Sequence, residues 1–123
     1  MLLNDFYNVN ELDQLAENKY LAKVILNPAH QIFKGHFPGN PVTPGVCMIQ
    51  IIKEITQEIL GVSLQMTASS NVKFMAIINP ETNPELTLEL DLSGNIASDV
   101  KVKNTTKFGD TVALKLTNTY RKA

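Results

Sequence analysis

The sequence predicts an α+β fold in which an antiparallel sheet wraps around one long central helix. Three observations support this fold class. Leucines alternate strictly with polar residues from Leu86 to Leu92, which is the period of a strand buried on one face. Apolar residues recur at helical spacing over residues 44–60. The other apolar runs are short and lie on both sides of that segment, so one helix has to pack against one sheet.

The N-terminal part of the chain predicts a hairpin followed by a loop. Its strands are the apolar runs Phe6–Val9 and Tyr20–Leu26, and the polar residues 17–18 suit the turn between them. Pro28 ends the second strand because proline has no N–H to donate to a sheet. The loop that follows is rich in glycine and proline over residues 35–45, so its path is tightly restricted.

A helix is expected over residues 44–60. Pro44 suits its first position with Thr43 as the N-cap, and Gly61 suits the position just beyond its end. Its first half is apolar nearly all round, which predicts a largely buried helix. The residues that recur at helical spacing are Met48, Ile52, Ile55 and Ile59.

The C-terminal half predicts an antiparallel meander. Turns are expected after residue 78, at residues 93–95 and at residues 108–110. Such a sheet has exposed edges, and pairing with a second subunit covers an edge completely, so a homodimer is expected. The predicted strands are Val72–Ile78, Leu86–Leu92, a strand around Val100–Val102, and Val112–Leu116.

Composition excludes several classes of function. The 123 residues suit a single domain spanning residues 1–123, and 44% apolar with 19% charged residues is typical of a soluble globular protein. A net charge of −1 with scattered lysines argues against binding to nucleic acid. Cys47, the only cysteine, excludes an intrachain disulfide, favours the cytoplasm and is interpreted as a small buried apolar residue. No apolar stretch approaches the roughly 20 residues of a membrane span.

The segment between the hairpin and the helix carries a specific motif. Residues 30–46 closely resemble the signature of 3-hydroxyacyl-acyl-carrier-protein dehydratases of the FabA/FabZ type, above all in the Gly-His-Phe-Pro-Gly-x-Pro-Val-x-Pro-Gly pattern of Gly35–Gly45. The resemblance implies a hot-dog fold whose dimer holds two active sites at the subunit interface. It also implies dehydration of (3R)-3-hydroxyacyl thioesters of acyl carrier protein to trans-2-enoyl products, in fatty-acid or related lipid or polyene biosynthesis. No cofactor or metal is expected.

The resemblance assigns roles to five residues of this segment. His36 falls on the catalytic histidine, and an imidazole titrates close enough to neutral pH to take the weakly acidic C2 proton. The structural alternative is a histidine that only ties down the loop, which is how His30 is interpreted. Gly45 and the adjacent Val46 offer backbone N–H groups to the developing thioester oxyanion, although Gly45 also suits a tight turn. Phe37 and Pro38 are expected to shape the acyl tunnel wall.

The sequence departs from the family at the second catalytic group. Fourteen residues after the histidine the family has Asp or Glu, and this chain has Gln50, whose carboxamide has no proton to exchange near neutral pH. One turn later, where the family often has glutamine, stands Glu54, so the pair looks transposed. Residues four apart share a helix face at roughly 5–6 Å, near enough for Glu54 to act through Gln50 or a bridging water. The alternative is a solvated polar stripe with Lys53, Gln57 and Glu58.

Three functions remain open on this sequence. The first is a dehydratase with His36 as base and an acid step that is reduced, water-mediated or moved to Glu54. The second is a non-catalytic acyl-thioester-binding subunit, paired with a homologue that contributes the missing carboxylate. The third is a hot-dog thioesterase, which needs a water attacking the carbonyl, and the histidine signature argues against it.

Overall fold

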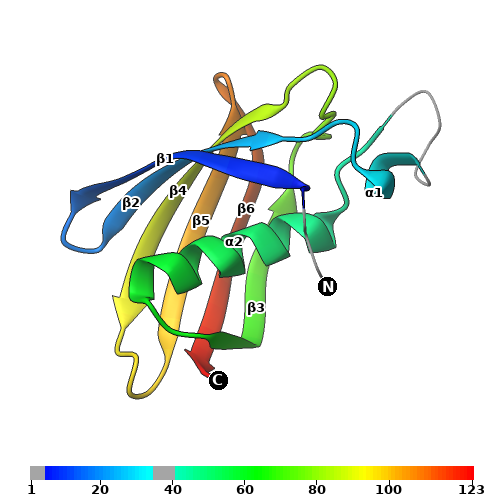
Figure 1. The fold of residues 1–123 in the computed structure, drawn as a ribbon. Coiled ribbons are helices and arrows are strands. Elements are labelled where there is room, and N and C mark those ends of the chain that lie inside the picture. The colour runs from blue at the N-terminus through cyan, green and yellow to red at the C-terminus, as the bar shows by residue number, and fades with distance from the viewer. Residues whose placement is uncertain (1–4, 35–40) are drawn as a thin grey trace.

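The structure, a computed structural model, describes residues 5–34 and 41–123. These residues form a six-stranded antiparallel sheet with the strand order β1-β2-β4-β5-β6-β3, and a long helix, α2, lies across one face of it (Figure 1). This arrangement confirms the α+β class and the hot-dog architecture. The elements are β1 (Tyr7–Ala16), β2 (Lys19–Leu26), α1 (Gln31–Lys34), α2 (Gly45–Leu60), β3 (Leu64–Phe74), β4 (Glu85–Gly94), β5 (Val100–Phe108) and β6 (Thr111–Lys122).

The hydrophobic core lies between α2 and the sheet. The alternating leucines of β4 are buried as the period-two pattern predicts, while Glu89 and Asp91 between them are exposed. The apolar residues that recur at helical spacing in α2 form one face of this helix, and that face is completely buried. The core residues contributed by these two elements are Cys47, Met48, Ile51, Ile52, Ile55, Leu86, Leu88, Leu90 and Leu92.

The two ends of α2 are built differently. Gly61 adopts the left-handed conformation (φ 69°) and its N–H donates to the Gln57 carbonyl at 2.8 Å, so the predicted C-terminal glycine is confirmed. The prediction of Thr43 as N-cap is wrong. Extended Pro44 is the N-cap, and no described residue forms a hydrogen bond with the buried Thr43 hydroxyl. The Thr43 N–H instead donates to the Ile78 carbonyl at 2.9 Å, which holds this residue against the segment after β3.

The expected strand at residues 72–78 has the wrong bounds. The strand β3 begins at Leu64 and ends at Phe74, so most of it precedes the prediction. Among the described residues it is the last strand of the sheet and pairs only with β6, and every residue from Gln65 to Phe74 is exposed. An edge strand without a buried face has no alternation of polar and apolar residues, which is why its sequence did not indicate it.

The predicted N-terminal hairpin is confirmed, with its turn at residues 17–18, but β1 extends to Ala16. Its added residues are mostly exposed and polar, so they lack a strand pattern. The short helix α1 was not predicted. The ring nitrogen Nδ1 of His30 accepts the Ile32 N–H at 3.1 Å at the start of α1, and the His30 ring meets the Phe6 ring edge to face. These contacts agree with the interpretation of His30 as a loop anchor.

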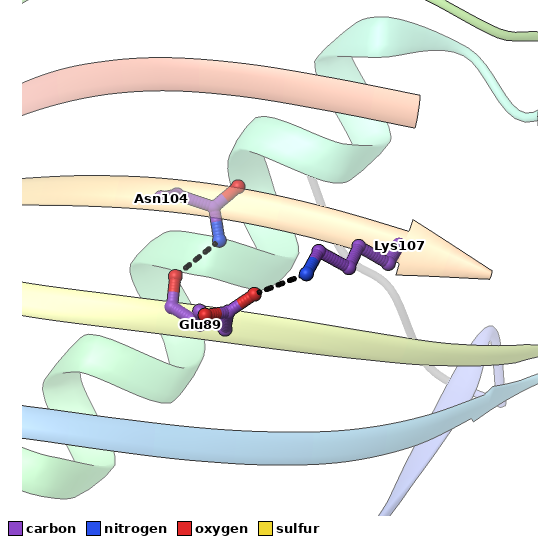
Figure 2. Close-up of polar contacts among 3 residues, drawn as sticks. All are labelled: Glu89, Asn104 and Lys107. Atoms are coloured by element: carbon purple, nitrogen blue, oxygen red, sulfur yellow. Dashed lines mark hydrogen bonds and ion pairs between the residues drawn. The ribbon is translucent and has the colours of Figure 1, made fainter. Parts of the chain in front are cut away.

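Polar side chains also tie the middle of the sheet together. Asn104 on β5 is 1% exposed and its Nδ2 donates to the backbone carbonyl of Glu89 on β4 at 3.1 Å. The Glu89 carboxylate in turn lies 3.1 Å from the Lys107 ammonium, so two β5 side chains reach one β4 residue (Figure 2). A buried amide is tolerated here because its N–H is satisfied. These contacts reinforce the pairing of β4 with β5 over which α2 packs.

Candidate active site

The structure places four of the predicted site residues on α2 and leaves three undescribed. Gly45 and Val46 form the first turn of the helix, and Gln50 and Glu54 follow on its next two turns. His36, Phe37 and Pro38 lie outside the described residues. The described part of the candidate site is therefore one row along α2, with residues 46, 50 and 54 spaced four apart on one face.

Gln50 and Glu54 are in direct contact. Gln50 Nε2 donates to Glu54 Oε2 at 2.9 Å in a partly buried setting. An ionised carboxylate only accepts hydrogen bonds, so the amide nitrogen of Gln50 has to face Glu54, and the amide oxygen then faces away from it. This arrangement leaves the Gln50 oxygen and its second N–H for a neighbouring hydroxyl or water.

Tyr7 is a member of the site that the sequence analysis missed. It lies at the start of β1, and its hydroxyl donates to Glu54 Oε1 at 2.8 Å. Both oxygens of Glu54 therefore accept a hydrogen bond, one from α2 and one from β1. Glu58, one turn further along, is exposed. The polar stripe of α2 is therefore not solvated along its whole length. Glu54 is half-buried and accepts two hydrogen bonds, whereas Glu58 faces solvent.

The environment of Tyr7 keeps its phenol protonated. Burial raises the pKa of Tyr7 well above its ordinary value, and the hydrogen bond to Glu54 and the negative charges of Glu54 and Glu58 raise it further. The phenol is therefore un-ionised in the neutral range and acts there as a hydrogen-bond donor. Burial also raises the pKa of the Cys47 thiol, which agrees with its interpretation as an apolar core residue.

The N-terminus of α2 offers unpaired backbone donors. The Cys47 and Met48 N–H groups both donate to the Pro44 carbonyl, at 3.0 and 3.3 Å. Within the described residues nothing accepts the N–H groups of Gly45 and Val46, which is the normal state of a first helical turn. Because an α-helix rises about 6 Å over four residues, Gln50 lies about one turn from these donors and Glu54 about two turns.

A packing reason for glycine at position 45 also emerges. A Cβ atom added to Gly45 would lie 2.6 Å from Cζ of Phe74, so the ring at the end of β3 occupies the space that a side chain would need. Gly45 does not adopt a positive φ. Phe74 and Val46 are themselves 58% and 59% exposed, and Met75 and Ile77 after β3 are exposed as well. We call these four exposed side chains the apolar rim.

The described residues contain no cluster of three His, Cys, Asp or Glu side chains that could hold a metal ion. Within the same part of the chain, no helix is long and apolar enough to cross a membrane. What the site does contain is a pair of backbone donors, an amide one turn away and a half-buried carboxylate behind it. This set can bind a carbonyl oxygen and a nearby hydroxyl of one small ligand.

Comparison with known proteins identifies the family. A family model described as the ApeI-like dehydratases matches residues 12–116, which is most of the chain. The chain belongs to the ApeI-like dehydratase family. This membership confirms the resemblance to hot-dog dehydratases that residues 30–46 indicate, and it extends the match beyond that segment to the sheet.

Relatives of this ApeI-like chain include 3-hydroxyacyl-acyl-carrier-protein dehydratases named FabZ. The FabZ of Caulobacter vibrioides is 34% identical over 88 residues, which cover 66% of this chain and 55% of that protein. The chain thus spans about half the length of that relative. A FabZ of Thermoanaerobacter sp. (strain X514) is 27% identical over 116 residues, covering 88% of this chain and 80% of the relative.

A solved structure supports the fold of the ApeI-like chain over nearly its whole length. It is described as the dehydratase heterocomplex ApeI:P from Xenorhabdus doucetiae, and its matching chain superposes with a TM-score of 0.75 at 22% identity. The match covers 94% of this chain and 97% of the other. At this identity the likeness establishes the shared hot-dog fold.

Proposed function

We propose that this chain dehydrates (3R)-3-hydroxyacyl thioesters of acyl carrier protein to trans-2-enoyl thioesters, as one domain spanning residues 1–123. Membership of a dehydratase family supports the reaction, and the names of the FabZ relatives support the substrate class. The single observation that carries the proposal is the hydrogen bond between Gln50 and Glu54. It keeps a carboxyl group one helical turn from the position where the family has its own.

The first half of the proposed reaction removes the C2 proton. His36 takes this proton, and the electron pair of the C–H bond moves toward the thioester carbonyl, whose oxygen becomes negative. The N–H groups of Gly45 and Val46, which no described residue accepts, stabilise that oxygen in a preorganised way, with the helix dipole adding to the effect. Phe37 and Pro38, which lie outside the described residues, remain predictions for the wall of the acyl tunnel.

In the second half of the proposed reaction the C3 hydroxyl leaves. The carbonyl re-forms, the C2–C3 double bond forms, the C3–O bond breaks, and the leaving hydroxyl takes a proton and departs as water. The hydroxyl is two carbons from the thioester carbonyl, so it lies near Gln50 and one turn short of Glu54. Gln50 orients the hydroxyl. The Glu54 carboxylate takes up a proton from solvent and passes it to the hydroxyl through a water beside the amide, and His36 releases the C2 proton to solvent after each turnover. A carboxylate has about four lone-pair sites, so hydrogen bonds from Tyr7 and Gln50 leave room for that water.

The proposed assembly is a homodimer in the cytoplasm, with acyl carrier protein as the partner that delivers the substrate. The outer edge of β3, which no described strand pairs with, and the apolar rim support the dimer, because an open strand edge beside exposed apolar side chains is stabilised when a second copy covers both. The single, buried cysteine supports a reducing compartment.

A second candidate function is a non-catalytic acyl-thioester-binding subunit. Gln50 favours it, because a carboxamide cannot protonate a leaving group. The solved structure described as a dehydratase heterocomplex shows that a protein of this fold can work beside a different subunit. In this alternative a homologous partner contributes the acidic side chain across the interface.

One assay separates these functions. Purified protein is given a 3-hydroxyacyl thioester on acyl carrier protein, enoyl formation and free-thiol release are both followed, and the native mass is measured on the same sample. We expect enoyl formation by the homomer without thiol release. A homomer that forms no enoyl product contradicts the proposal and favours the binding subunit, while thiol release without enoyl product identifies a thioesterase.

A further inference from the structure

We propose that Tyr7 is a positioning residue for this reaction, which holds the carboxyl group of Glu54 in the orientation that Gln50 requires. The inference rests on the proposed function. It goes beyond it because Tyr7 comes from β1, outside the segment and helix that carry the family signature. The contact that carries it is the hydrogen bond of 2.8 Å from the Tyr7 hydroxyl to Glu54 Oε1.

The geometry of Glu54 explains why a second donor is needed. The terminal torsion of a glutamate side chain is soft, with broad and roughly two-fold preferences. A single hydrogen bond from Gln50 to Oε2 leaves the carboxyl group able to turn about that torsion. A donor on the other oxygen, supplied from a separate element, fixes the plane of the carboxyl group and thereby the direction of its free lone pairs.

The chemistry of Tyr7 suits a fixed donor. The groups that face it are Glu54, which accepts its hydrogen bond, and Glu58, whose negative charge acts at longer range, and both belong to α2. Tyr7 is half-buried with its ring packed against the core, so the hydroxyl reaches Glu54 from a supported position. Tyr7 contacts no substrate in this account, because Glu54 already lies about two turns from the oxyanion donors.

The test replaces Tyr7 with phenylalanine, which keeps the ring and removes only the hydroxyl. Tyr20→Phe is the matched control, because Tyr20 is also half-buried against the core but donates no hydrogen bond to α2 in the described part of the chain. We expect Tyr7→Phe to lower kcat by about tenfold or more, because the variant loses one hydrogen bond to a charged group and that bond is worth about this factor in rate. KM and the melting temperature should stay at the values of the Tyr20→Phe control.

Making the same Tyr7→Phe substitution in a Glu54→Asp variant tests whether Tyr7 acts through Glu54. Glu54→Asp keeps a carboxyl group but withdraws it from the Tyr7 hydroxyl by one methylene. In this background Tyr7→Phe should cause no further loss of kcat, because the contact is already broken. An equal loss in both backgrounds shows that Tyr7 acts elsewhere and overturns the inference.

Different results would contradict the positioning role of Tyr7 and the proposed acid role of Glu54. Full kcat in Tyr7→Phe, together with a severe loss in Glu54→Gln, overturns only the positioning role. Full activity in Glu54→Gln removes Glu54 from the reaction and overturns both the acid assignment and the inference. A fall in kcat matched by a fall in the melting temperature identifies Tyr7 as a residue of structural importance only, which also overturns the positioning role.

Discussion

Replacing Glu54 with glutamine is expected to lower kcat for enoyl formation by about 10²- to 10⁴-fold, the usual contribution of a general acid. Glutamine has nearly the same shape and can still accept the hydrogen bond from Tyr7 through its oxygen. Its amide nitrogen then faces Gln50, whose amide turns over to accept through its oxygen, so the local packing persists. What the variant lacks is an exchangeable proton. The measurement is steady-state formation of the enoyl thioester on acyl carrier protein.

Glu58→Gln is the control for this loss. It removes the same charge from the same helix one turn later, at an exposed position without a hydrogen bond from Gln50 or Tyr7. We expect it to keep the activity of the unmodified protein. If Glu54→Gln behaves like Glu58→Gln, the two glutamates belong to one solvated stripe and the acid assignment is wrong.

Replacing His36 with alanine is expected to reduce enoyl formation by a similar factor, about 10²- to 10⁴-fold, because the C2 proton then has no positioned base. His36→Asn distinguishes the base from a loop anchor. Asparagine retains hydrogen-bonding capacity in a side chain of related size but cannot accept a proton near neutral pH. Both variants should be inactive to a comparable degree.

The structural alternative for His36 gives a different result. A histidine that only ties down the loop by hydrogen bonding would tolerate asparagine far better than alanine. Substantial activity in His36→Asn, with a melting temperature like that of the unmodified protein, therefore contradicts the assignment of His36 as the base.

The parts of the fold that could be predicted are those with a buried face. The alternation from Leu86 to Leu92 and the apolar repeat of α2 record burial directly in the order of residues, and Gly61 marks the helix end because its φ is positive. For β3 the predicted bounds were wrong: only residues 72–74 of the expected strand belong to it, since the strand is exposed along nearly all its length. The N-cap at Thr43 failed because a tertiary contact with Ile78 sets the position of that residue.

The same distinction applies to the candidate site. Contact between Gln50 and Glu54 follows from helical spacing, so a local rule was sufficient. Contact between Tyr7 and Glu54 joins residues 47 positions apart and depends on how the first hairpin meets α2. The close approach of the Phe74 ring to Gly45 joins the end of β3 to the start of α2, and helical or strand spacing does not predict it. Tertiary contacts of this kind leave no pattern in a single sequence.

In the proposed reaction the catalytic carboxyl group of this ApeI-like chain lies one helical turn further along α2, at Glu54. The most direct measurement compares enoyl formation by Glu54→Gln with that of the double variant Gln50→Glu/Glu54→Gln. The double variant restores the family's order and keeps an amide and a carboxyl group four residues apart. We predict that it recovers activity to within about tenfold of the unmodified chain, while Glu54→Gln alone stays at least about 10²-fold lower. A double variant no more active than Glu54→Gln, or a fully active Glu54→Gln, contradicts the claim.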